Sequence, residues 1–269
     1  MMTRFAIFVD GSNLVGSLRH LNAQVSEYQD FYKHVFEEAL TIWKTSISGQ
    51  THPVAQLTRV HWYQMGTMDE LNLSSDTRLL ESLKNQFLSD VDLKRSYLAL
   101  AGNKLKGRSQ TEITTEAWNM CINECKSWYE NKCRQLNEIR KFNYGVRSST
   151  DFIDIIECGH WKIDLLYKSA TEKGVDTRMA VDMVTNCRHF DVALVISGDA
   201  DAIPSVNFIK NNGCQIATVD IIKGYPPEKR GRQSSTKLQN VSDFVVPIFE
   251  MSLMQKKIIT PYIPKSNSI

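Results

Sequence analysis

The chain has 269 residues, a length that suits one large α/β domain or a domain with an insertion. Because 42% of the residues are hydrophobic and the net charge is only +2, the chain can bury a sizeable core and carries no global charge signal for a polyanionic partner. No apolar run reaches membrane-spanning length, and Asp10 interrupts the N-terminal apolar segment, which argues against a signal peptide. We therefore expect a cytoplasmic protein without a membrane partner.

The first half of the chain predicts strands separated by helices. The apolar run from Arg4 to Asp10 is typical of a strand buried on both faces. Apolar residues at spacings of three and four then predict helical structure with a break near Asn22. The elements expected after the first strand are helical structure over 14–48, a loop over 49–53, a strand over 56–66, a helix over 76–89 and a strand over 91–101 that alternates only in part.

The second half begins with the clearest long helix, over 114–141, whose apolar residues follow the 3.6-residue period. We favour a helix docked on the core; the alternative is a lid or an arm that contacts a second copy or a protein partner. Pro247 predicts an edge strand, and Asn211-Asn212-Gly213 predicts a left-handed helix end. The other elements expected are strands over 152–156, 192–196, 213–220 and 243–249, a helix over 177–187, a basic loop over 223–237 and a loosely held tail from Lys256.

The alternation of strands and helices at both ends of the chain predicts an α/β fold, with a mainly parallel sheet covered by helices on both faces. The cysteines show no Cys-x-x-Cys pair and the histidines no ligand spacing, so a zinc site is not expected. We predict reduced thiols that fill the core. They belong to Cys121, Cys125, Cys133, Cys158, Cys187 and Cys214.

Carboxylates follow two of the predicted central strands. Asp10 ends the first strand, and Asp199 and Asp201 follow the run from Val192 to Ile196. Ligands of open α/β sheets bind at the carboxyl edge of the strands, where these acids would meet. Mg²⁺ and Mn²⁺ prefer oxygen ligands, and Mg²⁺ often needs only one or two carboxylates plus water and phosphate. The pattern therefore predicts a divalent-metal site that hydrolyses a phosphate ester.

Two further acids lie near the start of the helix over 177–187. Asp176 precedes it, and Asp182 lies within an apolar stretch, where a carboxylate is costly unless it is paired or bound to a metal. Each acid also has a structural interpretation. Asp176 could cap the helix, Asp201 could cap a helix that starts at Ala202, and Asp10 could accept hydrogen bonds from the following turn. Acids at three separate junctions together favour a site.

Three motifs in this order resemble the NYN domain, specifically its LabA-like branch within the PIN-like nuclease superfamily. They are Phe8-Val-Asp10-Gly-Ser-Asn13, Glu172-Lys-Gly-Val-Asp176 with Ala180-Val-Asp182, and Val195-Ile-Ser-Gly-Asp199-Ala-Asp201. The resemblance covers about residues 4–66 and 156–249. It implies one three-layer α/β/α nuclease domain over 1–255, with a helical insertion at about 103–155 and a tail over 256–269.

The resemblance also implies a Mg²⁺- or Mn²⁺-dependent ribonuclease, with a partly assigned site. Asp10, Asp176, Asp199 and Asp201 match the acidic metal-binding positions. Asn13 would orient Asp10 or the substrate, Ser197 matches a position near the phosphate, and Asp182 matches a motif acid without a clear metal role.

Basic loops near these motifs are candidates to neutralise RNA phosphates, and single-stranded RNA suits loops that mix basic and aromatic residues. The alternative for each loop is ordinary solvated surface. The candidates are Lys168, Lys173, Arg178, Lys223, Lys229, Arg230 and Arg232. Two other functions stay open: a catalytically silent module that binds RNA or protein, and a metal-dependent phosphatase for a small ester.

Overall fold

The computed structural model describes residues 2–52, 54–226 and 235–262 of the chain, which divide into two compact units. Met1–Gln64, Phe142–Gly159 and Gly174–Ile269 form the first, which we call the sheet unit. Met65–Lys141 and His160–Lys173 form the second, which we call the helical unit. The helical unit thus begins well before the insertion that the sequence suggests at about 103–155.

A seven-stranded, mostly parallel sheet confirms the predicted fold class. Its strand order is β5-β4-β3-β1-β6-β7-β8, and β1 lies between β3 and β6 with both partners parallel. β6, β7 and β8 continue the parallel pairing, whereas β4 and β5 are antiparallel. The strands are β1 (Thr3–Asp10), β3 (Ala55–Met68), β4 (Ile153–Asp164), β5 (Ser169–Lys173), β6 (Val192–Ile196), β7 (Gln215–Ile222) and β8 (Phe244–Phe249).

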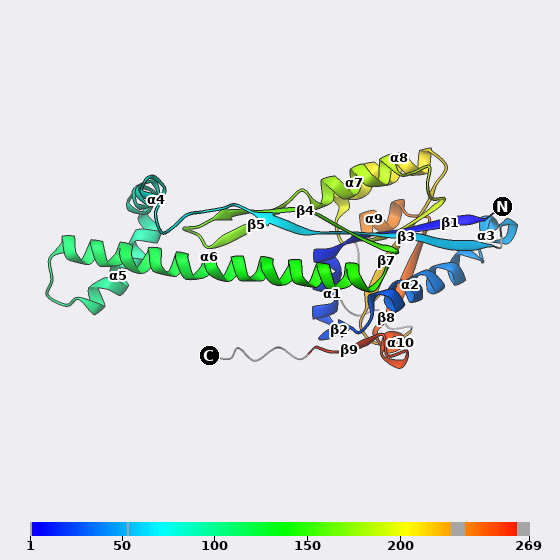
Figure 1. Ribbon diagram of the computed structural model, residues 1–269, viewed down its shortest axis with the longest axis horizontal. Helices are drawn as coiled ribbons and strands as arrows, with labels where there is room; N and C mark the ends of the chain where they lie inside the picture. Colours follow the sequence, from blue (N-terminus) through cyan, green and yellow to red (C-terminus); the bar gives the residue numbers. More distant parts are fainter. Residues whose placement is uncertain (1, 53, 227–234, 263–269) are drawn as a thin grey trace. The chain divides into compact units, whose positions relative to one another are not determined.

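Helices cover both faces of the sheet within the sheet unit, so that its layers are α/β/α (Figure 1). Successive residues of a strand point to opposite faces, and accordingly Phe5 and Ile7 lie in one core while Ala6 and Phe8 lie in the other. The first core takes apolar residues from α1 (Gly11–His20), α2 (Tyr28–Trp43) and α10 (Glu250–Gln255). The second takes them from α7 (Val175–Thr185), α8 (Ile203–Asn211) and α9 (Thr236–Val241).

The N-terminal helical region contains the break predicted near Asn22 and one unexpected strand. Asn22 has a φ of 52°, and β2 (Ala23–Val25) follows it. The loop predicted over 49–53 is wrong for residues 49–51, which belong to α3 (Ile47–Thr51). This short helix forms because Ser46 caps it, its hydroxyl accepting a 3.1 Å hydrogen bond from the Gly49 amide. Pro53 lies outside the described residues.

The segment from Lys256 to Tyr262 is held to the sheet unit, so the prediction of a loose tail is wrong there. β9 (Ile259–Pro261) pairs antiparallel with β2. Ile258 and Ile259 are buried in the core. The prediction did not take into account that burial of Ile258 and Ile259 in the core can hold a short terminal strand in place. Residues 263–269 lie outside the part of the chain that the structure describes.

Most of the helical unit is made of α4 (Thr77–Ser89), α5 (Val91–Lys104) and the residues of α6 (Gln110–Ser149) up to Lys141. α4 confirms the helix predicted over 76–89. The strand predicted over 91–101 is wrong, because this segment is helical. Asp90 caps α5 by accepting hydrogen bonds from the amides of Asp92 and Leu93, at 3.1 and 2.9 Å. Tyr97 and Ala101, four residues apart, then bury one face of the helix.

The α6 part of the helical unit packs against α4 and α5, in agreement with the docked arrangement that we favoured for the predicted 114–141 helix. Phe87 of α4 contacts Trp118 at 5.6 Å between ring centroids and Tyr97 of α5 at 6.0 Å. Cys121 and Cys125 are buried in the same cluster. All six cysteines of the chain are free thiols, but the prediction that they fill the core holds only for Cys121, Cys125 and Cys214, because the other three are half-buried.

Several local predictions from the sequence are confirmed in the sheet unit. Gly213 follows α8 with a φ of 90°, which is the left-handed helix end. β8, which contains Pro247, is the edge strand beside β7.

Within the described ranges, no helix combines the length and the apolar composition that crossing a membrane requires.

Gly11 begins α1 in a place where a side chain has no room. A Cβ atom at this position would lie 2.4 Å from Trp62 Nε1 and 2.7 Å from the Tyr63 carbonyl oxygen. Gly145, an exposed residue within α6, has nothing within 4 Å of the same position. The turn between β1 and α1 therefore depends on a glycine, and α6 does not.

We predict that Gly11→Ala lowers the free energy of unfolding by about 1–3 kcal/mol, because β1 or β3 must shift to accept the methyl group. Gly145→Ala should raise it by about 0.5–1 kcal/mol through its better helix propensity. Chemical denaturation of the two variants beside the parent checks both signs. Equal stabilities for the three proteins would contradict the steric argument.

Candidate active site

The parallel pairing of β1 and β6 brings their carboxyl ends to one edge of the sheet. Val9 lies opposite Ile196, so that Asp10 and Ser197 follow at the same level. Both side chains are buried, each with 3% of its surface exposed. The segments that follow β1 and β6 therefore place polar side chains at the same edge of the sheet, where the sequence predicts a site.

Asp10 is held rigidly by the turn that follows it. Its Oδ1 accepts hydrogen bonds from the Ser12 hydroxyl at 2.8 Å and the Asn13 amide at 3.1 Å, and its Oδ2 accepts one from the Asn13 side-chain amide. Asp10 is therefore the N-cap of α1, which was the structural alternative for this residue. The same contacts fix the orientation of the carboxylate, with Asn13 as one of the donors.

Asp199 organises the turn between β6 and α8. Its amide donates to the Ser197 hydroxyl at 3.2 Å, and its Oδ1 accepts a hydrogen bond from the Asp201 amide at 3.1 Å. Asp199 thereby caps the short 3-10 helix Ala200–Ala202, and α8 starts only at Ile203. The alternative role of Asp201 as a helix cap is therefore wrong. Asp199 and Asp201 are both exposed.

Asp176 lies in the first turn of α7. The residue that caps this helix is Gly174, with a φ of 94°, so the alternative role of Asp176 as a cap is wrong as well. Asp176 is exposed on its outer side. Its pKa is raised, first by partial burial of the carboxylate and then by the negative charges of Asp10, Asp199 and Asp201. The structure thus places Asp176 within electrostatic range of the other three acids.

These four acids, which we call the acidic cluster, suit a hard divalent cation by their donor chemistry. In the described ranges, no three acidic, histidine or cysteine side chains stand close enough to hold one ion directly. Mg²⁺, however, commonly takes one or two carboxylates and completes its shell with water and substrate phosphate. After partial burial, the second cause of the raised pKa of Asp176 is the negative field of the other three acids, which a cation would neutralise. The residues therefore fit an ion that is held partly through water.

Asp182 has a partner of its own. The Arg178 Nε donates to Asp182 Oδ1 at 3.0 Å and Oδ2 at 2.9 Å across one turn of α7. Asp182 is buried, with 8% of its surface exposed, and its charge adds to burial in raising the pKa of Tyr63. The pairing that a buried carboxylate requires is thus supplied by Arg178, which was a candidate for RNA contact.

The other basic candidates are distributed over both units. Lys223 is exposed just after β7 in the sheet unit. Lys168 and Lys173 belong to the helical unit, where the Lys168 ammonium donates to Glu124 at 2.8 Å and to the Tyr97 hydroxyl at 3.2 Å. Lys229, Arg230 and Arg232 lie outside the described residues.

Asp220 is a further acid at the carboxyl end of a parallel strand, and the sequence analysis missed it as a site residue. It is buried near the end of β7, where the Gln239 side-chain amide donates to its Oδ2 at 2.8 Å. Because Val195 of β6 pairs with Thr218, Asp220 continues the register at the level of Ser197. The run Ile216-Ala-Thr-Val-Asp220 repeats the pattern of an apolar strand that ends in an acid, and this repetition was the available signal.

Comparisons with known proteins give one family and one distant structure. The sequence pattern of the NYN domain matches residues 4–248. No curated protein matches the chain significantly. A crystal structure of a Vibrio parahaemolyticus protein of unknown function is similar at 14% sequence identity, covering 92% of this chain and 94% of the other, with a TM-score of 0.41.

The repulsion within the acidic cluster gives a test of its geometry. Asp176→Asn removes one charge, so it should raise the free energy of unfolding at neutral pH, by only about 0.5 kcal/mol because exposed charges are screened. A carboxyl with a raised pKa weakens the fold above that pKa and ceases to do so once it is protonated. The gain should therefore vanish on acidification. Thermal unfolding of the parent and of Asp176→Asn, at neutral pH and at a pH where Asp176 is protonated, checks this. A variant less stable than the parent at neutral pH would contradict it.

Proposed function

The chain belongs to the NYN domain family of the PIN-like nuclease superfamily, and on this premise we propose that it is a metal-dependent endoribonuclease of the LabA-like branch. Its substrate is single-stranded RNA, and its reaction is hydrolysis of a phosphodiester bond. The observation that carries the proposal is the register of β1 and β6, which brings Asp10 and the turn with Asp199 and Asp201 to one edge of the sheet, where Asp176 senses the charge of all three. Helix capping alone would not require these carboxylates to lie within one another's electrostatic field.

The four acids differ in ways that suit different tasks. Asp10 is buried and fixed by Ser12 and Asn13, so it supplies a carboxylate of constant position at the bottom of the site. Asp199 and Asp201 are exposed on a short turn and can adjust to an ion and its water shell. Mg²⁺ or Mn²⁺, when bound, would lower the pKa of an attacking water and stabilise negative charge on the phosphate.

Asp176 is suited to take up the proton of the attacking water. Partial burial and then the charges of its neighbours raise its pKa, so its carboxylate oxygens bind a proton more strongly than those of an isolated aspartate. The water oxygen forms a bond to phosphorus, the bond from phosphorus to the leaving oxygen breaks, and that oxygen takes a proton. Ser197, buried beneath the turn, fixes the Asp199 amide and thereby the loop that faces the phosphate.

RNA would be held by basic and aromatic side chains around the cluster. Lys223 and Tyr225 are both exposed after β7, where one can neutralise a phosphate and the other can stack on a base. The Nε of Arg178 is already used by Asp182. Arg178 can therefore bind a phosphate either through its other guanidinium nitrogens or by breaking the pair with Asp182. Lys168 and Lys173 are further candidates for RNA contact in the helical unit, where Lys168 is already engaged with Glu124.

The test is cleavage of end-labelled single-stranded RNA in Mn²⁺, Mg²⁺ or EDTA. We predict cutting that requires a metal, and a loss of about 100-fold or more in Asp199→Asn, because an ion contributes several kcal/mol of charge stabilisation. Asp30→Asn on α2, an exposed acid away from the cluster, is the matched control and should cut as the parent does. Full activity of Asp199→Asn would refute the assignment.

The same assay separates the alternatives. RNA that is bound but never cut under any metal would identify a catalytically silent binding module, which the lack of three converging acids in the described residues would favour. Hydrolysis of a simple aryl phosphate without cleavage of RNA would identify a phosphatase. In either case the proposed endoribonuclease activity fails.

A further inference from the structure

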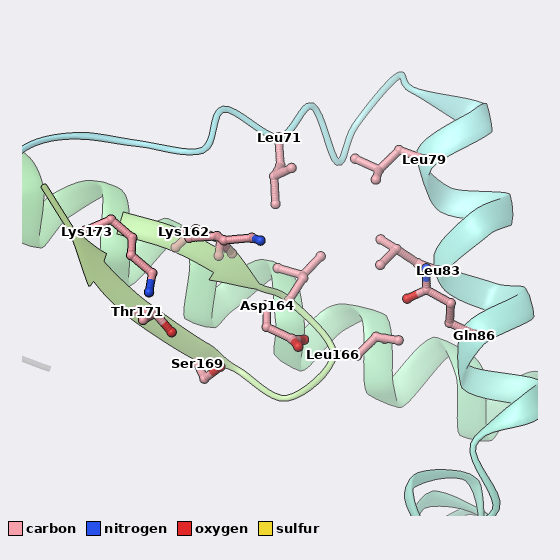
Figure 2. A pocket seen from close by; sticks show the side chains of 12 residues that line it. Leu71, Leu79, Leu83, Gln86, Lys162, Asp164, Leu166, Ser169, Thr171 and Lys173 are labelled. Atoms are coloured by element: carbon pink, nitrogen blue, oxygen red, sulfur yellow. The ribbon is translucent and has the colours of Figure 1, made fainter. Parts of the chain in front are cut away.

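A cavity in the helical unit contains none of the acids of the proposed metal site, and one of its lining residues, Lys173, is also a candidate for RNA contact. It has a volume of about 560 Å³, is open to solvent on one side, and is lined by α4, the segment before it, β4, β5 and the turn that joins the two strands (Figure 2). This volume falls within the range of about 300–1,000 Å³ that is usual for small-molecule sites. All of its lining residues belong to the helical unit, so the cavity exists independently of the acidic cluster.

One side of the cavity is apolar. Leu79 and Leu83 project from α4, and Leu71 and Leu166 complete this side from the flanking segments (Figure 2). Leu83 and Leu166 are buried, whereas Leu71 and Leu79 are half-buried and still present surface to the cavity. A flat apolar group between these leucines would remove that surface from water.

The opposite side is a polar face of the β4–β5 hairpin. Thr171 pairs with Lys162 and Ser169 pairs with Asp164, and paired residues of an antiparallel ladder share a face. Lys173 is two residues beyond Thr171 and lies on the same face. This face therefore presents two ammonium groups, two hydroxyls and one carboxylate to the cavity.

These polar groups are available to a ligand. Among the described residues, neither Lys162 nor Lys173 forms an ion pair within 4.0 Å, in contrast to Lys168 with Glu124 nearby in the sequence. The side chains of Ser169 and Thr171 make no hydrogen bond in the same part of the chain. Asp164 uses one oxygen, Oδ1, to accept a 3.2 Å hydrogen bond from the Tyr167 amide.

The groups also follow an order along the hairpin. Lys173 and Lys162 are farther from the β4–β5 turn, Asp164 and Ser169 are next to it, and the leucines and Gln86 lie toward α4. The Cα atoms of Lys162 and Asp164 are about 7 Å apart along an extended strand. This order matches the parts of a nucleotide. The lysines suit a phosphate, the carboxylate and hydroxyl suit a sugar with free hydroxyls, and the leucines with one amide suit a base.

We propose that this cavity binds a nucleoside monophosphate. Lys162 and Lys173 bind the phosphate, Asp164 accepts hydrogen bonds from the ribose hydroxyls, and the leucines cover the base while Gln86 reaches its edge. The lysines alone would also bind inorganic phosphate, and the leucines alone would also bind a lipid chain. Only a ligand with a phosphate, a ribose and a base uses all parts of the cavity. The bound unit is either a free nucleotide or the 5′-phosphorylated end of an RNA.

The test is calorimetric titration of the full chain with adenosine 5′-monophosphate in EDTA, carried out in the Asp199→Asn background. These conditions remove metal-mediated binding at the acidic cluster, so this result and the cleavage result are independent. We predict saturable binding, with adenosine and inorganic phosphate each weaker by about tenfold or more, because each lacks the charge-assisted or the apolar part of the contact.

Lys162→Gln should weaken nucleotide binding by about tenfold, and Lys84→Gln should leave it unchanged. Lys84 is the matched control because it is exposed on α4 but does not line the cavity. Asp164→Asn should reduce the preference for the ribonucleotide over its 2′-deoxy analogue. Since Lys162 and Lys173 are exposed, the double variant Lys162→Gln with Lys173→Gln should fold, as circular dichroism can verify.

Absence of binding at millimolar nucleotide, or unchanged binding in the folded double variant, would overturn the proposal. A 5′-phosphorylated trinucleotide that competes as well as or better than the mononucleotide would identify an RNA end as the source of the ligand. Weaker competition by the trinucleotide would identify a free nucleotide. Both of these outcomes support the site and differ only in what occupies it.

Discussion

The parallel pairing of β1 with β6 is the constraint on which the site depends. Val9 opposite Ile196 fixes the level at which the two strands end, and a shift of one residue would turn Asp10 toward the opposite core. The register is secured by the strands themselves, because alternate residues of β1 fill two different apolar cores. The position of the acids is therefore a consequence of hydrophobic packing elsewhere in the sheet.

The acidic cluster is a place where the fold tolerates repulsion. Partial burial of Asp176 raises its pKa, and the negative charges of Asp10, Asp199 and Asp201 raise it further. By contrast, two other acids of the sheet unit are each matched to an arginine, Asp182 to Arg178 and Asp191 to Arg4, both at 2.9 Å. Acids that share a negative field at a sheet edge without such a partner are candidates for a binding site.

The fold class and the central strands could be predicted from the sequence because their signals are local. Fully buried strands are continuous apolar runs, and Asp10 and Asp199 follow two of them closely, whereas Asp176 lies in the first turn of a helix. The failures occurred where a capping contact decided the structure. Asp90 makes a helix of the segment 91–101 by binding two amides, and Ser46 does the same for residues 47–51. Such contacts depend on the conformation of one residue, and periodicity does not reveal them.

Other features depended on contacts between distant segments. Ile259 pairs with Val25, and neither residue alone predicts the strand that the two form. The cavity of the helical unit combines leucines of α4 with lysines that follow about 80–90 residues later, so no motif in the sequence could announce it. Asp220 was visible as the end of an apolar run, but its register beside Ser197 came only from the pairing of β6 with β7.

The capping and the functional interpretations of the acids are compatible, because a carboxylate can accept about four hydrogen bonds. Asp199 uses Oδ1 for the Asp201 amide, and Asp10 uses both oxygens for Ser12 and Asn13. The caps hold these carboxylates in place and leave acceptor capacity for a cation or its waters. Asparagine is as good a cap as aspartate but lacks the charge. Asp199→Asn therefore separates the two roles, since the amide oxygen can still accept from the Asp201 amide while the charge is removed, whereas Asp10 needs both oxygens as acceptors.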